Sequence, residues 1–457
     1  MLGLFGKYLT NEKDKEVIKN IIASFAIKGG ALLISLASLP AYIRYFNNQE
    51  VLGVWFTILS VLTWILTFDF GIGNGLRNKL VGAIVRKNKT EILENISSAY
   101  IIIGAITILV SSFSVIIFLY INWNSVFNIS ETLISSQTLL FTIICAFLTI
   151  MLQFFFRLIS FILYALQKSF LNNLIALLTS VSQLIFVLIA PSFDSETNMK
   201  ILSIVNLMCV NLPLVGATFF VFKTNLKGCF PSLRYFNKDV ATGILHLGGI
   251  FFWNQIMYTA ITGTNAILIT RFIGPSSVVD YQIYYRLFSI IGIIFSLSLT
   301  PMWSAITKAL AENDNKWINK YFRVLNRLVV LVVLLHLLSI PFIQFIVDIW
   351  LGENSININI INALIFAVFG SVFVFQNVLS TFACGIGQLR LQAYFYTIGV
   401  FVKIIFVYFG IEIYSSWVTI VISDIIILLP YCISQWAVLK KQFSLAAKTG
   451  INIQISS

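Results

Sequence analysis

The stretch IIIGAITILVSSFSVIIFLY, residues 101–120, contains no charged side chain and is long enough to cross a membrane as one helix. Comparable apolar runs recur from Ile21 to Val438. Of the 457 residues, 58% are hydrophobic and only 11% are charged, whereas a soluble domain carries about 25% charged residues. This composition cannot cover a water-soluble surface, so the sequence predicts an all-α polytopic membrane protein.

The apolar runs predict twelve membrane-spanning helices, because each crossing of the hydrocarbon core needs about twenty residues. The expected limits are residues 20–45, 50–70, 93–121, 135–165, 170–190, 200–222, 244–272, 278–305, 324–350, 357–385, 391–411 and 414–438. The segments between them are short. They leave no room for an extracytoplasmic domain and argue against a soluble catalytic domain.

Basic residues in the connecting segments predict the orientation of the helices. Alternate segments carry 23 lysines and arginines on one side of the membrane and 3 on the other. Since cytoplasmic loops are enriched in basic residues, both termini are expected in the cytoplasm. The first apolar run is longer than a signal-peptide core, so no cleavable signal peptide is predicted.

An internal repeat divides the chain into two halves. A shift of 227 positions aligns Arg44-Tyr45-Phe46 with Arg271-Phe272-Ile273, and also aligns Phe25 with Phe252. The expected organisation is an N-terminal six-helix bundle at 1–225, a cytoplasmic linker at 226–243, and a C-terminal six-helix bundle with a short tail at 244–457. Because six is even, both bundles have the same orientation and are related by a pseudo-two-fold axis along the membrane normal. Transporters of this kind usually bind substrate between the halves.

Several functional classes are disfavoured by composition. The chain has 2 histidines and 5 cysteines, without the spacing of a zinc, haem or iron–sulfur site. The net charge of +12 is spread between apolar runs, so nucleic acid is not expected as a partner. No Walker motif is present. Neither a metal nor another cofactor is therefore predicted.

Four basic side chains fall inside the predicted spans and are candidates for substrate binding. They are Lys28, Arg157, Arg286 and Lys403. The first three lie on polar stripes at helical spacing, while Lys403, with Gln392 and Tyr396, makes a weaker stripe. Ionisable groups at bilayer depth usually face a cavity or a partner. A cavity lined by these cations would attract anions, and arginine in particular suits phosphate.

Four further charged residues are candidates for gating or coupling: Arg44, Asp69, Arg271 and Asp424. For Arg44 and Arg271, near the outer ends of their spans, snorkelling to the headgroups is an equally good interpretation. Asp69 could instead anchor a helix end or a loop. Asp424 could serve as the counter-ion of a buried cation.

Two short motifs carry a resemblance to a known family. They are FDFGIGNGLRNKL at residues 68–80 and GIGQLR at residues 385–390. With twelve spans in two halves, the chain resembles the Wzx-type polysaccharide-repeat flippases of the multidrug/oligosaccharidyl-lipid/polysaccharide (MOP) exporter superfamily, to which the MATE transporters belong. The resemblance covers nearly the whole chain.

The resemblance implies a V-shaped, MATE-like pair of six-helix bundles. It implies a flippase that moves an undecaprenyl-pyrophosphate-linked oligosaccharide from the cytoplasmic to the outer leaflet by alternating access, for O-antigen or capsule synthesis. Its partners would be that lipid, the bilayer, and polysaccharide polymerase or assembly proteins. The family's basic cavity corresponds to Lys28, Arg157, Arg286 and Lys403 by character and depth, without a motif match.

Two other functions compete with this hypothesis. The first is a multidrug/cation antiporter on the same fold, driven by protons or sodium at Asp69 or Asp424. The second is a membrane enzyme such as an oligosaccharide polymerase or ligase, which usually needs a large extracytoplasmic loop that this chain lacks. The sequence therefore favours a transporter over an enzyme.

Overall fold

The computed structural model describes most of the chain and divides it into two compact units, residues 1–249 and 250–457. The division falls within one long helix, C-terminal to the linker expected at 226–243. The described residues are 23, 27, 29–31, 34, 38, 41–42, 44–67, 71–127, 129–191, 193–273, 276–351, 357–414 and 416–449.

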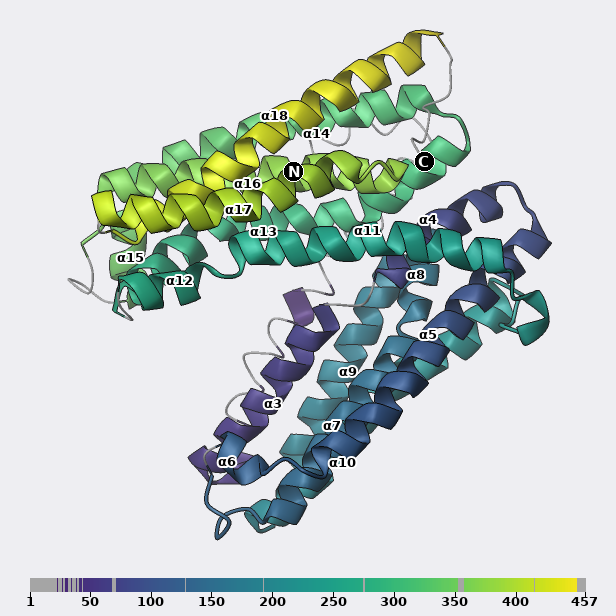
Figure 1. Ribbon diagram of the computed structural model, residues 1–457, viewed down its shortest axis with the longest axis vertical. Helices are drawn as coiled ribbons and strands as arrows, with labels where there is room; N and C mark the ends of the chain where they lie inside the picture. Colours follow the sequence, from purple (N-terminus) through teal and green to yellow (C-terminus); the bar gives the residue numbers. More distant parts are fainter. Residues whose placement is uncertain are drawn as a thin grey trace. The chain divides into compact units, whose positions relative to one another are not determined.

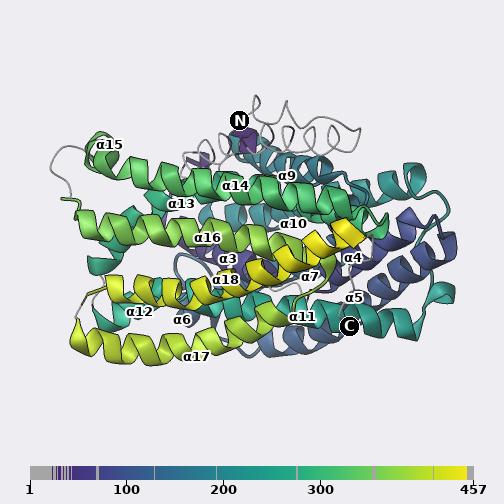
Figure 2. The same ribbon diagram turned by 90° about the horizontal axis from the view of Figure 1, so that it is seen from above.

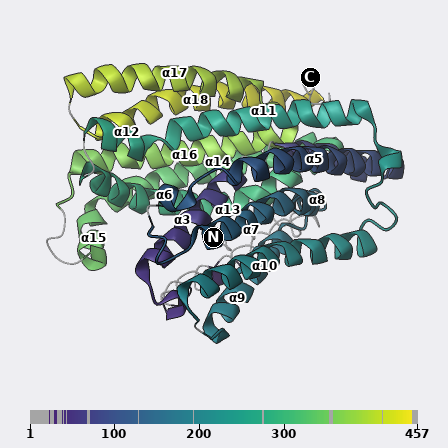
Figure 3. The same cartoon turned by 60° about the horizontal axis from the view of Figure 1, so that its bottom comes forward.

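The first unit is a bundle of helices with its core between α4, α5, α7, α8 and α10. Its elements are α3 (Gln49–Thr67), α4 (Ile72–Val85), α5 (Lys89–Phe118), α6 (Trp123–Phe127), α7 (Ser136–Phe156), α8 (Leu158–Ala165), α9 (Ser169–Ile189), α10 (Ser195–Thr224), the 3-10 helix η1 (Leu233–Tyr235) and the first half of α11 (Lys238–Thr262). Figure 3 shows α7, α9 and α10 lying together, and α10 packs on both neighbours.

The second unit begins with the remainder of α11. It continues with α12 (Asn265–Phe272), α13 (Ser276–Ala311), α14 (Asn315–Ser339), the 3-10 helix η2 (Ile340–Phe342), α15 (Ile343–Leu351), α16 (Ile360–Ile386), α17 (Arg390–Ile413) and α18 (Val418–Thr449). Figures 1 and 2 show α14, α16, α17 and α18 running side by side.

The two units repeat one another in their packing. In the first unit α5 packs on α7, α7 on α10, and α9 on α10; in the second unit α14 packs on α16, α16 on α18, and α17 on α18. These helices correspond by their order along the two halves of the sequence. The contacts of α4 with α5 and of α13 with α14 match in the same way. The structure therefore supports the internal repeat with long-range packing as well as sequence.

Ten helical segments of the described part are long and apolar enough to cross a membrane. They coincide with the third to twelfth predicted spans. The second predicted span falls on α3, in which Glu50–Leu59 is a shorter apolar segment, and most of the first span lies outside the described residues. The chain is thus an all-helical, multi-pass membrane protein within the described ranges.

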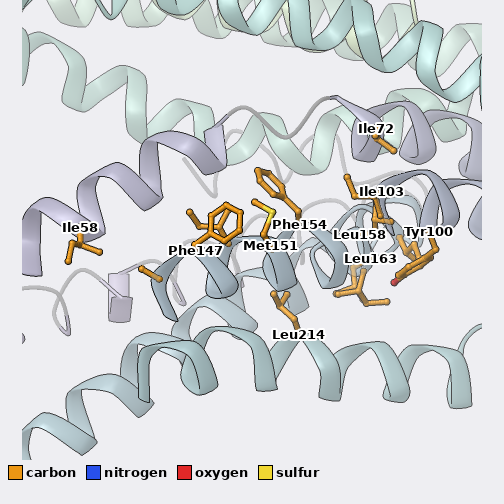
Figure 4. Packing of buried hydrophobic residues seen from close by; sticks show 14 of the residues in the cluster. Ile58, Ile72, Tyr100, Ile103, Phe147, Met151, Phe154, Leu158, Leu163 and Leu214 are labelled. Carbon is orange, nitrogen blue, oxygen red and sulfur yellow. The ribbon is translucent and has the colours of Figure 1, made fainter. Parts of the chain in front are cut away.

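Large apolar side chains cover the outer surface of the helices. In α5, for example, Phe113 is 65% exposed and Leu109 is 60% exposed. Lipid can cover such a surface, whereas water cannot do so without a large free-energy cost. Other apolar side chains point inward: Figure 4 shows Phe147, Met151 and Phe154 in the core of the first unit.

A close approach of two helices in the first unit depends on glycine. Gly71, immediately before α4, has a positive φ of 66°, a conformation that side chains disfavour. A Cβ atom on Gly71 would overlap the carbonyl oxygen of Gly248 in α11, and one on Gly75 would lie 2.6 Å from the carbonyl oxygen of Ile244. Glycine at these positions therefore lets α4 and the first half of α11 pack backbone to backbone.

We expect Gly71→Ala to lower the free energy of unfolding by about 2 kcal/mol, because it combines left-handed strain with overpacking. Thermal unfolding of the purified chain in detergent measures the effect. Gly53→Ala is the matched control, since Gly53 lies on an exposed face of α3 with no atom within 4 Å of its built Cβ. Equal midpoints for the two variants would contradict the close packing at Gly71.

Candidate transport site

Helix α17 has an inverted distribution of side chains, with apolar residues outside and polar residues inside. The buried positions are Gln392, Tyr396, Gly399, Lys403 and Val407, which recur every three or four residues and form one face. The outer face carries exposed apolar side chains, among them those at 398, 401, 404 and 405. This pattern suits a helix that turns its outer face to lipid and a polar face to the bundle interior.

The polar face of α17 holds a buried ion pair. The Nζ atom of Lys403 lies 2.7 Å from Oδ1 of Asp424 in α18. Lys403 is 3% exposed and Asp424 is 0% exposed. Lys403 also donates hydrogen bonds to Oδ1 of Asn265 and to the carbonyl oxygen of Ile261. We call these four residues the Lys403 site.

Asn265 completes the Lys403 site by contacting both charges. Its Oδ1 accepts from Lys403, while its Nδ2 donates to Oδ2 of Asp424 at 2.6 Å and to the hydroxyl oxygen of Tyr281 at 3.3 Å. The amide therefore turns its oxygen to the cation and its NH₂ group to the carboxylate. Both oxygens of Asp424 are engaged, which offsets much of the desolvation cost of burying the pair.

Polar contacts continue along the inner face of α17. Nε2 of Gln376 in α16 donates to the hydroxyl of Tyr396 at 2.5 Å, and Nε2 of Gln392 donates to Oγ of Ser380 at 3.1 Å. The ring of Tyr396 lies 5.2 Å from that of Tyr431 in α18, measured between centroids. The interior of the second unit thus holds buried amides and aromatic rings, and its amides and hydroxyls form hydrogen bonds with one another.

The first unit has a basic and aromatic cluster of its own, which we call the Tyr164 cluster. The guanidinium carbon of Arg77 lies 4.8 Å from the centroid of the Tyr164 ring, a cation–π distance. The Tyr164 hydroxyl accepts a hydrogen bond from Nδ2 of Asn172 at 2.7 Å. Arg77 is only 2% exposed, so we assign it to anchoring α4 on α8.

Arg157 lies at the junction of α7 and α8 and is half-buried. Its Nη1 atom donates to the carbonyl oxygen of Leu66, near the end of α3, at 3.0 Å. Leu66 is the only hydrogen-bond partner of this guanidinium among the residues that the structure describes. A guanidinium has five N–H donors. Toward the described residues, Arg157 is therefore held by one bond, and its other N–H groups make no hydrogen bond to that part of the chain.

The other predicted residues occupy separate places. Arg44 is exposed, and its Nη2 donates to the carbonyl oxygen of Leu188 at 2.6 Å. Arg271, in the last turn of α12, and Arg286, in α13, are exposed. Lys28 and Asp69 lie outside the described residues. The structure thus brings together Lys403 and Asp424, and it does not place Arg286 in the Lys403 site.

Sequence reasoning misses two residues of these clusters. Arg77 reads as a basic residue of a cytoplasmic segment, but it is buried within α4. Its place in the FDFGIGNGLRNKL motif is the available signal. Asn265 carries no charge and does not stand out by itself. The polar run Thr262-Gly263-Thr264-Asn265, which interrupts the seventh span, could have indicated it.

No group of three or more histidine, cysteine, aspartate or glutamate side chains that could hold a metal ion occurs in the described part of the chain. His336, on α14, is buried between Oγ of Ser371 and the carbonyl oxygen of Phe288, with 3.1 Å to each. It is a hydrogen-bonded packing residue. A cavity of about 380 Å³ in the first unit is lined mostly by apolar residues such as Phe147 and Met151, and offers little to an anion.

Comparisons with known proteins identify the fold and a relative. No family model matches the chain. A curated relative named "Putative O-antigen export protein", from Yersinia pseudotuberculosis, is 25% identical over 361 residues, which cover 75% of this chain and 77% of that protein.

Three solved structures match almost the full length of the chain. A MATE transporter in the bent conformation gives a TM-score of 0.74 at 13% identity, covering 96% of this chain and 98% of that one. An outward-facing multidrug resistance MATE transporter of the MOP superfamily gives 0.69 at 16% identity, with coverage of 96% and 98%. A MOP superfamily transporter from Pyrococcus furiosus, described as having a binding pocket of reverse polarity, gives 0.70 at 16% identity, with coverage of 96% and 97%.

The fold is therefore that of a multi-pass, MATE-like membrane transporter. The resemblance to Wzx-type exporters, drawn from the sequence motifs, agrees with the similarity to the O-antigen export relative, and the expected MATE-like fold is confirmed by these structures.

Proposed function

We propose that the chain is a flippase for undecaprenyl-pyrophosphate-linked oligosaccharide repeat units in surface polysaccharide synthesis. It would act in the bacterial cytoplasmic membrane, with both termini in the cytoplasm, and would move its substrate by alternating access. The two bundles would form at 1–225 and 244–457. The observation that carries this proposal is the similarity to an O-antigen export protein over three quarters of the chain.

The chemistry of Arg157 supports an anionic substrate. Toward the described residues, Arg157 has uncommitted donors for a pyrophosphate, and an arginine fork can make paired, charge-assisted hydrogen bonds to phosphate oxygens. Gln376, Gln392 and Tyr396 in the second unit are buried and hydrogen-bonded inside the bundle, so they would contact sugar only in a state of the transport cycle that exposes them. The isoprenoid chain would remain in the bilayer, where it is most soluble.

The basic residues predicted from sequence enter this proposal with different roles. Arg157 would contact the pyrophosphate, with Lys28 and Arg286 as further candidates for the basic cavity. Lys403 is already paired with Asp424. We therefore propose that it contributes to coupling or gating together with Asp424, and that Arg44, Asp69 and Arg271 are candidates for the same task.

Deleting the gene in its host tests the proposed function. We expect lipid-linked repeat units to accumulate on the cytoplasmic leaflet by at least about tenfold while surface polysaccharide is lost, because synthesis of the repeat unit continues without its translocation. Expression of the intact chain should restore both levels. Leaflet-specific labelling of the glycan, with the total lipid-linked pool as control, measures the effect.

An unchanged lipid-linked pool and unchanged surface polymer would contradict the flippase proposal. Saturable efflux of a cationic dye that is lost in Asp424→Asn would then favour the multidrug/cation antiporter. The structure gives this alternative less support, since both oxygens of Asp424 are engaged by Lys403 and Asn265. An oligosaccharide polymerase would instead leave single translocated repeat units on the outer leaflet of the deletion strain.

A further inference from the structure

Three oxygen atoms from three helices converge on the ammonium group of Lys403. They are Oδ1 of Asp424 in α18, Oδ1 of Asn265 in α12 and the carbonyl oxygen of Ile261 in α11. Carboxylate, amide and backbone carbonyl oxygens are also the ligands that hard metal cations prefer. The ammonium group thus occupies a position that a free cation could fill.

The backbone at Ile261 favours a cation independently of the side chains. Helix α11 ends at Thr262, and α12 begins at Asn265. The last four carbonyl groups of a helix lack partners within the helix, and the helix dipole places partial negative charge there. The carbonyl oxygen of Ile261 accepts a hydrogen bond from Lys403. Ile261 is 0% exposed, so bulk water does not compete for this oxygen.

The charge of the oxygen set selects a monovalent cation. Asp424 supplies one negative charge, while Asn265 and Ile261 are neutral. A monovalent cation brings the net charge of the buried site to zero, as Lys403 does. A divalent cation would leave one uncompensated positive charge inside the bundle, which is costly at this depth.

We propose that the Lys403 site is a monovalent-cation site occupied by a cation tethered to the chain, and that truncating the Lys403 side chain opens it to a free alkali cation. The intact protein then needs no free cation at this position. Shortening the side chain would make folding of the second unit depend on sodium or potassium. The inference goes beyond the proposed function, because it does not depend on which substrate is carried.

Thermal unfolding of the full-length Lys403→Ala protein in detergent tests the proposal. Unfolding is measured in NaCl, in KCl and in N-methyl-D-glucamine chloride at equal ionic strength. We expect the midpoint of Lys403→Ala to rise by about 3 °C in NaCl or KCl at saturating concentration, because a ligand that binds only the folded state stabilises it. The intact protein should unfold at the same temperature in all three salts.

Two further variants give the matched controls. Lys403→Ala/Asp424→Asn lacks the only charged oxygen of the Lys403 site and should show no alkali-cation dependence. Lys403→Met fills the space with an uncharged side chain of similar length and should show none either. If Lys403→Ala does not yield folded protein, Lys403→Ser, whose hydroxyl adds one oxygen to the opened site, replaces it in the same measurements.

Equal midpoints of the truncated variant in the three salts would overturn the proposal, as would failure of both truncated variants to fold in NaCl and KCl. An equal rise in the double variant would also overturn it, since the stabilisation would then come from elsewhere. The experiment uses no substrate, so its failure is distinguishable from failure of the proposed flippase function.

Discussion

Asp424→Ala is expected to destabilise the chain by about 3–5 kcal/mol, because it breaks a buried ion pair by removing one partner. The substitution removes the partner of an ammonium group that is 3% exposed. It leaves Lys403 with only the neutral oxygens of Asn265 and Ile261. A lone charge in the bundle interior is costly whether the lysine stays charged or loses its proton.

Reversible unfolding of the purified variant in detergent measures this effect. The matched control is Asp239→Asn, because Asp239 is exposed in the first turn of α11 and should change stability by less than about 0.5 kcal/mol. The double variant Lys403→Met/Asp424→Leu removes both charges and should recover most of the stability. A stability of Asp424→Ala equal to that of the intact protein would show that the ion pair is not formed in solution.

Hydropathy identifies the spans well because lipid exposure is a property of each segment by itself. The runs expected at 357–385 and 391–411 coincide closely with α16 and α17. Hydropathy does not predict helix α4, because this stretch of the sequence has the basic composition of a connecting segment. That stretch packs as a helix because its apolar side chains Ile72, Leu76 and Leu80 are buried and the helix lies against α5 and α8, which is a tertiary property.

The site is harder to predict than the fold. The sequence pattern favours the stripe around Arg286 over the one around Lys403, yet Lys403 is buried among polar partners and Arg286 is exposed. The spacing of polar residues along a helix shows which of them share a face, but it does not show which other helices, lipid or water that face contacts. Asp424 is a plausible counter-ion from sequence, and the structure pairs it with Lys403. Asn265 cannot be found in this way, because its role depends on the break between α11 and α12.

Arg157→Gln is expected to weaken binding of an isoprenoid pyrophosphate by about 100-fold. Each charge-assisted hydrogen bond to phosphate contributes about 1.5–3 kcal/mol, and a factor of ten in affinity corresponds to about 1.4 kcal/mol. The side chain has one bond to Leu66 and is half-buried, so its loss should affect folding less than binding. Arg157→Lys keeps the charge without the planar fork, and we expect a loss of about tenfold.

Titration of the purified protein with farnesyl pyrophosphate measures this affinity, and farnesol serves as the uncharged ligand. Arg234→Gln is the matched control, because Arg234 is exposed in η1 and should leave binding unchanged. Unfolding midpoints of all variants identify any general loss of structure. An affinity for farnesyl pyrophosphate that does not change in Arg157→Gln would exclude Arg157 from the anion site. An equal loss of farnesol binding would show that the substitution acts through packing rather than through the charge, and the basic contacts would then have to come from other cations of the chain.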